Sequence, residues 1–200
     1  MKHMVRLCVS LLIFCLLFYM MPAHGEANIY DEVIRLHVLA ASDSTEDQTI
    51  KLYVRDALLA TMPSLIGTCR TRDEAADTIR ASLPALQDVA QKTLEDYGSA
   101  APVTLTLEEE YYPTRTYNGL AFPKGRYLSL RVNIGEAAGQ NWWCVLFPSL
   151  CLSAASRAEA EQTFIAAGLT PEEYRIITES DRNATYKLRF RILEILGDLF

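Results

Sequence analysis

The chain has 200 residues, of which 50% are hydrophobic and 22% are charged, and its formal net charge is −6 at pH 7. This composition suits a globular domain with a substantial core and excludes an intrinsically disordered chain. The acidic balance argues against nucleic-acid binding and against electrostatic adsorption to an anionic membrane, because both need clustered Lys and Arg. We therefore expect protein partners.

The first 25 residues have the organisation of a secretory signal peptide. Lys2 and Arg6 precede an apolar run over 7–21, and AHG at 23–25 offers small residues at the −3 and −1 positions of a cleavage site. A retained membrane anchor is the alternative, although a run of about 15 residues is shorter than the roughly 20 that span a bilayer. We therefore expect residues 26–200 to form one exported domain.

The segment VIRLHVLA at 33–40 is rich in β-branched and apolar residues, which predicts a buried strand. The polar stretch ASDSTEDQ follows. Within it, Ser44 stands three residues before Asp47, which is the spacing of a capping box. Apolar residues then recur at helical spacing, so a helix is expected to end between Pro63 and Gly67.

A second helix is predicted from Thr71 to Gly98. Glu74 stands three residues after Thr71, and a stripe of apolar residues follows at helical spacing. This stripe consists of Ala75, Ile79, Leu83, Leu86, Ala90 and Leu94. Pro84 interrupts it and is expected to kink the helix or to divide it in two.

The periodicity then changes from helical spacing to strict alternation. Apolar residues alternate with polar ones in VTLTLEEEY at 103–111 and in YLSLRVNI at 127–134. The first pattern predicts a half-buried antiparallel strand with Tyr111 on its apolar face. The segment NWWCVLF at 141–147 follows the loop GEAAGQ, so the last two strands are expected to form a hairpin.

Three helices are predicted for the C-terminal part. The first begins near Ser156 and stops at Gly168, and the second begins at Thr170 with proline at its first position. An amphipathic helix is expected from Lys187 to the end. Because strands and helices are segregated along the chain, the prediction is an α+β fold. It comprises a mainly antiparallel sheet of about four strands with helices packed on one face.

Three of the five cysteines lie after the predicted signal peptide, namely Cys69, Cys144 and Cys151. A disulfide between Cys144 and Cys151 requires the chain to turn back at Pro148, because a straight strand would hold the two residues too far apart. Two buried thiols are the alternative. Cys69 is expected to be the unpaired thiol.

The sequence contains no nucleotide-binding or metal-binding motif, so no cofactor and no metal are expected. The sharpest enzyme hypothesis is a Cys144 nucleophile with His37 as base and Asp43 as orienting group. The apolar residues around Cys144 argue against it. Asp43 and Asp47 could form an acid–base pair, but helix capping explains them better.

The aromatic segment YYPTRTYNGLAFPKGRY at 111–127 has two interpretations. Tyrosine and arginine anchor many protein interfaces, so it could be a docking surface. It could instead fold over the sheet as a lid on the core. On strand 141–147, alternation assigns Trp143, Val145 and Phe147 to the core and leaves Trp142 on the other face.

Two long stretches resemble the stage II sporulation protein R family. These are IRLHVLAASDSTEDQTIKLYVRDAL at 34–58 and YPTRTYNGLAFPKGRYLSLRVNIGEAAGQNWWCVLFPSLC at 112–151. The resemblance covers nearly all of the chain after residue 25, but only these two stretches are specific. Residues 64–100 and 152–200 match mainly in size and pattern.

The resemblance implies a signalling protein rather than an enzyme. Members are exported from the forespore into the space between the septal membranes, where they activate a membrane-embedded aspartic protease. That protease processes the precursor of sporulation sigma factor E. The resemblance implies no small-molecule substrate and no nucleic acid. The alternatives are an exported Cys/His-dependent hydrolase and an interaction domain without a signalling role.

No residue-level site follows from the resemblance itself. As a hypothesis, the surface that binds the protease combines the turn before the first helix, the aromatic segment and one tryptophan. Its candidate residues are Ser42, Asp43, Asp47, Tyr112, Arg115, Tyr117, Arg126, Tyr127 and Trp142.

Overall fold

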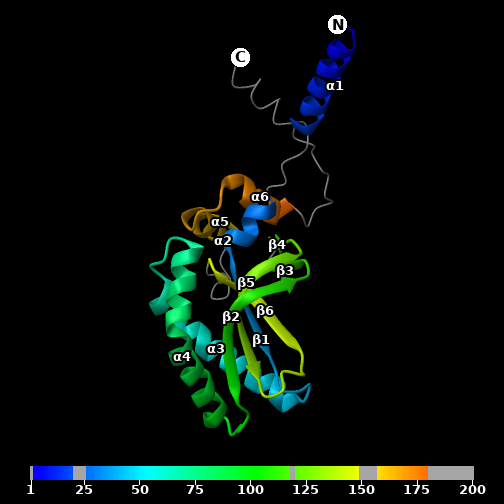
Figure 1. Cartoon of the computed structure of the whole chain (residues 1–200). Helices are drawn as coiled ribbons and strands as arrows, with labels where there is room; N and C mark the ends of the chain where they lie inside the picture. Colours follow the sequence, from blue (N-terminus) through cyan, green and yellow to red (C-terminus); the bar gives the residue numbers. More distant parts are fainter. Residues whose placement is uncertain (1, 20–25, 118–119, 149–156, 180–200) are drawn as a thin grey trace. The chain divides into compact units, whose positions relative to one another are not determined.

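A computed structural model describes residues 2–19, 26–117, 120–148 and 157–179. Backbone contacts divide the chain into two units, one of residues 26–182 and the other of residues 1–25 with 183–200 (Figure 1). Helix α1 (Lys2–Tyr19) belongs to the second of these units and covers most of the predicted signal peptide. Among the described residues, no helix combines the length and apolarity that crossing a bilayer requires.

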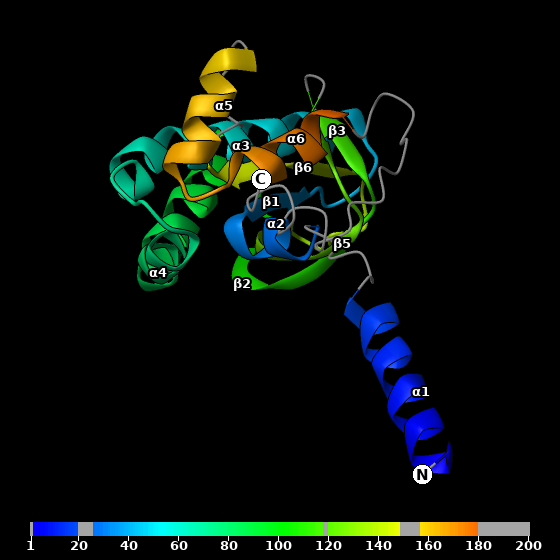
Figure 2. The ribbon, with the colours of Figure 1, turned by 90° about the horizontal axis from the view of Figure 1, so that it is seen from above.

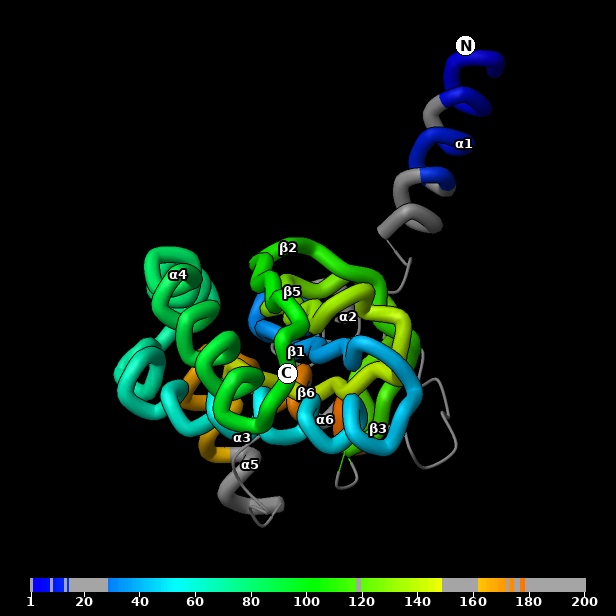
Figure 3. The backbone as a smooth tube through the Cα atoms, turned by 90° about the horizontal axis from the view of Figure 1, so that it is seen from below, coloured from blue at the N-terminus to red at the C-terminus, as the bar shows by residue number. Residues whose placement is uncertain are grey.

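The unit of residues 26–182 is built on a four-stranded sheet with the order β2-β5-β1-β6, which Figure 3 shows from below. The strands are β1 (Ile34–Leu39), β2 (Val103–Tyr112), β5 (Gly125–Ile134) and β6 (Asn141–Phe147). Strands β1 and β5 are parallel, and the other two pairs are antiparallel. The predicted α+β fold with a mainly antiparallel sheet is confirmed.

The predicted hairpin between the last two strands is wrong, because β1 lies between β5 and β6. The connecting loop passes over the end of β1 instead. The amide of Ala138 donates to the carbonyl of Ala41, and the amide of Gly139 donates to that of Ala40. A Cβ atom on Gly139 would lie 2.2 Å from the carbonyl oxygen of Ser42, so only glycine fits there. Alternation identified both strands but carries no information about their neighbours.

Helices α3 (Thr45–Ile66) and α4 (Arg72–Asp96) pack on one face of the sheet. Their predicted caps are present, since Ser44 accepts a hydrogen bond from the amide of Asp47 and Thr71 accepts one from Glu74. Helix α4 runs through Pro84 without being divided. The predicted apolar stripe of α4 lies against this face: five of its members are buried, and Leu83 is half-buried.

The opposite face carries a second apolar cluster that the sequence analysis did not predict. It joins the sheet to α2 (Glu26–Glu32), α5 (Arg157–Ala166) and α6 (Pro171–Glu179). It also includes the small hairpin of β3 (Arg115–Tyr117) and β4 (Leu120–Phe122). Helices α2, α5 and α6 gather at one end of the sheet, as Figures 1 and 2 show. The helix predicted from Lys187 lies outside the described residues.

This second cluster changes which residues of the edge strands are buried. Tyr111, predicted on the apolar face of its strand, is 63% exposed, whereas Tyr112 is 1% exposed. The reason is that the two faces of β2 are buried at different ends of the strand. The helix-covered face is buried at Val103 and Leu105, and the opposite face is buried at Tyr112.

On β6 both faces are covered. Trp143 and Val145 pack against the second cluster, as predicted for the core face, but Cys144 and Leu146 pack against the helix-side core. Phe147 also packs on the helix side, contrary to the prediction. A register shift between the partners of Ile34 and Arg35 adds one residue to β6, and this bulge reverses the alternation beyond it.

Candidate functional site

The densest group of polar side chains lies on the sheet face opposite α3 and α4. His37, on the central strand β1, is nearly buried. Its Nδ1 atom lies 2.7 Å from Oε1 of Glu110, and its Nε2 atom lies 2.7 Å from Oδ1 of Asn141. Because successive residues of a strand alternate between faces, His37 points away from the apolar core that Leu36 and Val38 enter. We call His37, Glu110, Arg131 and Asn141 the polar cluster.

Glu110, on β2, bonds to members of the polar cluster on β1 and β5. Its Oε1 atom also accepts a hydrogen bond from Nη1 of Arg131 at 2.6 Å, while Nε of Arg131 donates to Asn133. Burial alone would raise the pKa of Glu110. The hydrogen bond with His37 and the positive charges of His37 and Arg131 outweigh burial, so the pKa lies below its ordinary value. The carboxylate is therefore held ionised as a structural partner of His37 and Arg131.

Arg35 stands two residues before His37 on the same face and is fully buried. Its guanidinium carbon lies 4.5 to 5.4 Å from the centres of four aromatic rings. These rings belong to Tyr112, Tyr117, Phe122 and Tyr127. Its Nη2 atom donates to the Tyr117 hydroxyl at 2.8 Å, whereas Nε and Nη1 have no hydrogen-bond partner within the described part of the chain. Cation–π attraction thus holds the β3–β4 hairpin against the sheet.

Trp143 lies between the polar cluster and the ring group around Arg35. The guanidinium carbon of Arg115 lies 4.0 Å from the centre of the Trp143 ring, and the His37 ring centre lies 5.3 Å away. His37 and Trp143 each contact side chains from more than one other strand. The arrangement favours a rigid face over a substrate cleft.

The structure buries some of the predicted partner-binding residues and leaves others accessible. Tyr112 and Tyr127 are 1% and 0% exposed, so neither can contact a partner, and this part of the hypothesis is corrected. Tyr117 is half-buried against Arg35. The aromatic segment is therefore largely a lid on the core. It still presents the exposed side chain of Arg126 and the half-buried one of Arg115.

Trp142, the other predicted contact residue, is half-buried against the helix-side core. The guanidinium carbon of Arg55, from α3, lies 4.7 Å from the centre of its ring. The adjacent tryptophans are thus used on opposite faces of β6, and each is covered by an arginine.

The polar side chains in the turn before α3 make hydrogen bonds with nearby groups. The Ser42 hydroxyl donates to Asp47, and the Asp43 carboxylate accepts from the amide of Gln140 at 2.8 Å. Asp43 is exposed, and Ser42 and Asp47 are half-buried. These contacts support the capping interpretation over an acid–base pair.

The geometry also contradicts the Cys144–His37–Asp43 triad. Cys144 pairs with Leu36 on the helix-covered face, whereas His37 points to the opposite face and bonds to Glu110 and Asn141. Cys144 is disulfide-bonded and Cys69 is a free thiol. Cys151 lies outside the described residues, so its pairing with Cys144 stays a prediction. Among the described residues there is no group of three or more His, Cys, Asp or Glu that could hold a metal ion.

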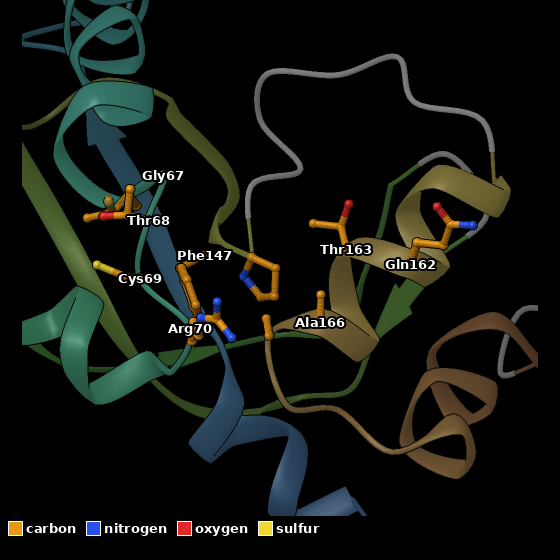
Figure 4. A pocket seen from close by; sticks show the side chains of 11 residues that line it. Gly67, Thr68, Cys69, Arg70, Phe147, Gln162, Thr163 and Ala166 are labelled. Carbon is orange, nitrogen blue, oxygen red and sulfur yellow. The ribbon is translucent and has the colours of Figure 1, made fainter.

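A pocket of about 930 Å³ lies between the end of α3, the end of β6 and α5 (Figure 4). Cys69 and Phe147 line it together with small and polar side chains, and Arg70 is its one charged lining residue among those described. No histidine or carboxylate stands beside Cys69 in this lining. The described lining residues therefore include no base that could activate the thiol.

Sequence reasoning missed Arg35, Glu110, Arg131 and Asn141. The sequence did contain one indication of a polar face. Arg35 and His37 interrupt an apolar strand at a spacing of two, so their side chains share one face of the sheet. The partners on β2, β5 and β6 could not be found in this way, since their approach depends on the strand order.

The described residues thus define an α+β domain in which His37, Glu110 and Arg131 contact one another on one face of the sheet, with no nucleophile–base pair there. A family model described as stage II sporulation protein R matches residues 30–157, and the chain belongs to this family. It is 28% identical over 186 residues to the stage II sporulation protein R of Bacillus subtilis strain 168. That alignment covers 86% of this chain and 83% of the relative. No solved structure matches the fold.

Proposed function

We propose that this chain is an exported signalling protein that activates a membrane-embedded aspartic protease during sporulation. In this proposal the forespore secretes it into the septal intermembrane space, and the activated protease processes the precursor of sigma factor E. The chain acts as a binding partner and contributes no catalytic group. Membership of the stage II sporulation protein R family is the observation that carries the proposal.

Two further observations support a ligand role. The first 25 residues have the pattern of an export signal. The enzyme alternative that the sequence suggested is contradicted by the opposite orientation of Cys144 and His37. A ligand of this kind works by binding the active arrangement of the protease more tightly than the inactive one, because only differential affinity shifts such an equilibrium.

The contact surface is proposed to use side chains that the fold leaves accessible. On the aromatic segment these are the exposed Tyr111 and Arg126 and the half-buried Arg115. Asp43 is accessible in the turn before α3. Tyr112 and Tyr127 would contribute only by holding this surface in place.

Co-expression of this chain, the protease and the sigma precursor in a host that does not sporulate tests the proposal. We expect the precursor to be cleaved only when all three proteins are present. Replacing the catalytic aspartate of the protease with alanine should abolish cleavage, which distinguishes activation from proteolysis by this chain itself. Precursor that stays uncut beside folded, exported protein would contradict the proposal, and so would cleavage with the inactive protease.

A further inference from the structure

Strand β2 forms one edge of the sheet, and its outward backbone groups belong to alternate residues. The amide of Gly135 donates to the carbonyl of Pro102 at 2.8 Å, which places the even-numbered residues of β2 in the bonded positions of the ladder with β5. The odd-numbered residues therefore direct their N–H and C=O groups away from the sheet.

The first half of this edge is closed by α4. The amide of Val103 donates to the side-chain oxygen of Gln91 at 3.2 Å, and the amide of Leu105 donates to that of Gln87 at 3.4 Å. Two glutamine side chains thus take the place of a neighbouring strand. Both bonds confirm that the odd-numbered amides point outward.

The second half of the edge is open. The outward amides of Leu107, Glu109 and Tyr111 have no hydrogen-bond partner among the described residues. Leu107 is half-buried against the helix-side core, whereas Glu109 is exposed and Tyr111 is 63% exposed, so the end of this stretch is accessible among the described residues. An unpaired strand edge of this kind is a template for an added strand.

The charge of the open edge indicates which occupant it fits. Glu108 and Glu109 are both exposed and form no ion pair within the described part of the chain. If a second copy paired here about a two-fold axis at Glu109, the two Glu109 side chains would face each other. Like charges at directly opposed positions are destabilising. A strand with basic side chains would instead gain complementary charge.

We propose that the edge of β2 from Leu107 to Tyr111 binds an extended, basic segment of the partner protein by adding it to the sheet. Backbone hydrogen bonds supply the pairing, the two glutamates select lysine or arginine opposite them, and Tyr111 contacts the end of the segment. The inference rests on the proposed function, in which the partner is the extracytoplasmic part of the protease.

Substitution at Glu109 tests the backbone pairing directly. Glu109→Pro removes an outward amide while the bonded amides of the β2–β5 ladder stay in place, and proline is tolerated on strand edges. Glu109→Thr is the matched control, because it removes the same charge and keeps the amide. In the co-expression assay we expect Glu109→Pro to lower precursor cleavage at least tenfold and Glu109→Thr to lower it no more than about threefold.

The charge of the partner is tested by Glu108→Lys/Glu109→Lys, which should lower cleavage more than Glu109→Thr does. A photo-crosslinking amino acid at position 109 should capture the co-expressed protease. The same group at the exposed loop residue Glu136 should not. The crosslinking measurement also decides the proposal if the proline variant fails to fold.

The outcomes separate this inference from the proposed function. If the wild-type chain activates cleavage and Glu109→Pro is equally active, the edge proposal is wrong and the activating role stands. Capture of a second copy of this chain at position 109, instead of the protease, would also overturn it. If the wild-type chain activates no cleavage, the activating role fails, and the edge proposal is then judged by whether position 109 captures the protease.

Discussion

The two faces of the sheet are stabilised in different ways. The face against α3 and α4 is lined by apolar side chains from every strand, and burial alone accounts for its packing. The opposite face combines aromatic rings with a fully buried arginine and with the ion pairs of the polar cluster. Alternate residues of the same strands thus contribute to two cores. One is held by apolar burial, and the other depends on contacts between particular side chains.

The largest effect is expected on the helix-covered face. Leu58 of α3 is fully buried in its core. Leu58→Ala should lower the free energy of unfolding by about 3 kcal/mol, because it removes buried methyl groups and leaves a cavity. Urea unfolding of the purified exported protein measures this change. The exposed Ala60→Ser on the same helix should change it by less than about 0.5 kcal/mol. A loss below about 1 kcal/mol for Leu58→Ala would show that this core tolerates cavities.

A smaller effect is expected for the ring group on the other face. Arg35→Ala should lower the free energy of unfolding by about 2 kcal/mol, since it removes packing and cation–π contacts to four rings. Near-ultraviolet circular dichroism should also change as the tyrosines lose their fixed environment. Arg70→Ala, at an exposed position, is the control. If Arg35→Met and Arg35→Ala both match the wild type, the guanidinium does not hold the hairpin.

The smallest effect is expected for the polar cluster, and it should depend on pH. Glu110→Gln removes a buried carboxylate that bonds to His37 and Arg131, at a cost of about 1–2 kcal/mol near neutral pH. Because the pKa of Glu110 is lower in the folded chain, its contribution is full above the ordinary pKa of 4.5. It is lost as the pH falls through the folded value.

Unfolding experiments on both proteins between pH 7 and pH 3 check this dependence. The difference in free energy between wild type and Glu110→Gln should shrink as the pH falls below about 4.5. Glu136→Gln, in the exposed loop, serves as the control. A difference that grows with acidity would contradict the structural role of the carboxylate.

The sequence predicted most elements because their signals are local. Ser44 and Thr71 cap α3 and α4 as expected, and Thr170 caps α6, with the Glu173 carboxylate accepting a hydrogen bond from its amide. The alternation of β2 and β5 was also correct over most of their length. The site was predicted less well, because Tyr112 and Tyr127 were assigned to the surface although both are buried. Their burial depends on Arg35, which lies far away in the sequence.

Local patterns in the sequence were enough to predict the four strands of the sheet, the helices α3 to α6, their caps and the family to which the chain belongs. Each of these follows from residues close together along the chain or from long matching stretches. The position of β1 between β5 and β6, which brings His37 to Glu110 and leaves the Cys144 side chain on the other face, became known only from the packed fold. It also decided that α4 closes half of the β2 edge and leaves half open. Both results depend on which strands and helices become neighbours, and periodicity within one segment does not encode that choice.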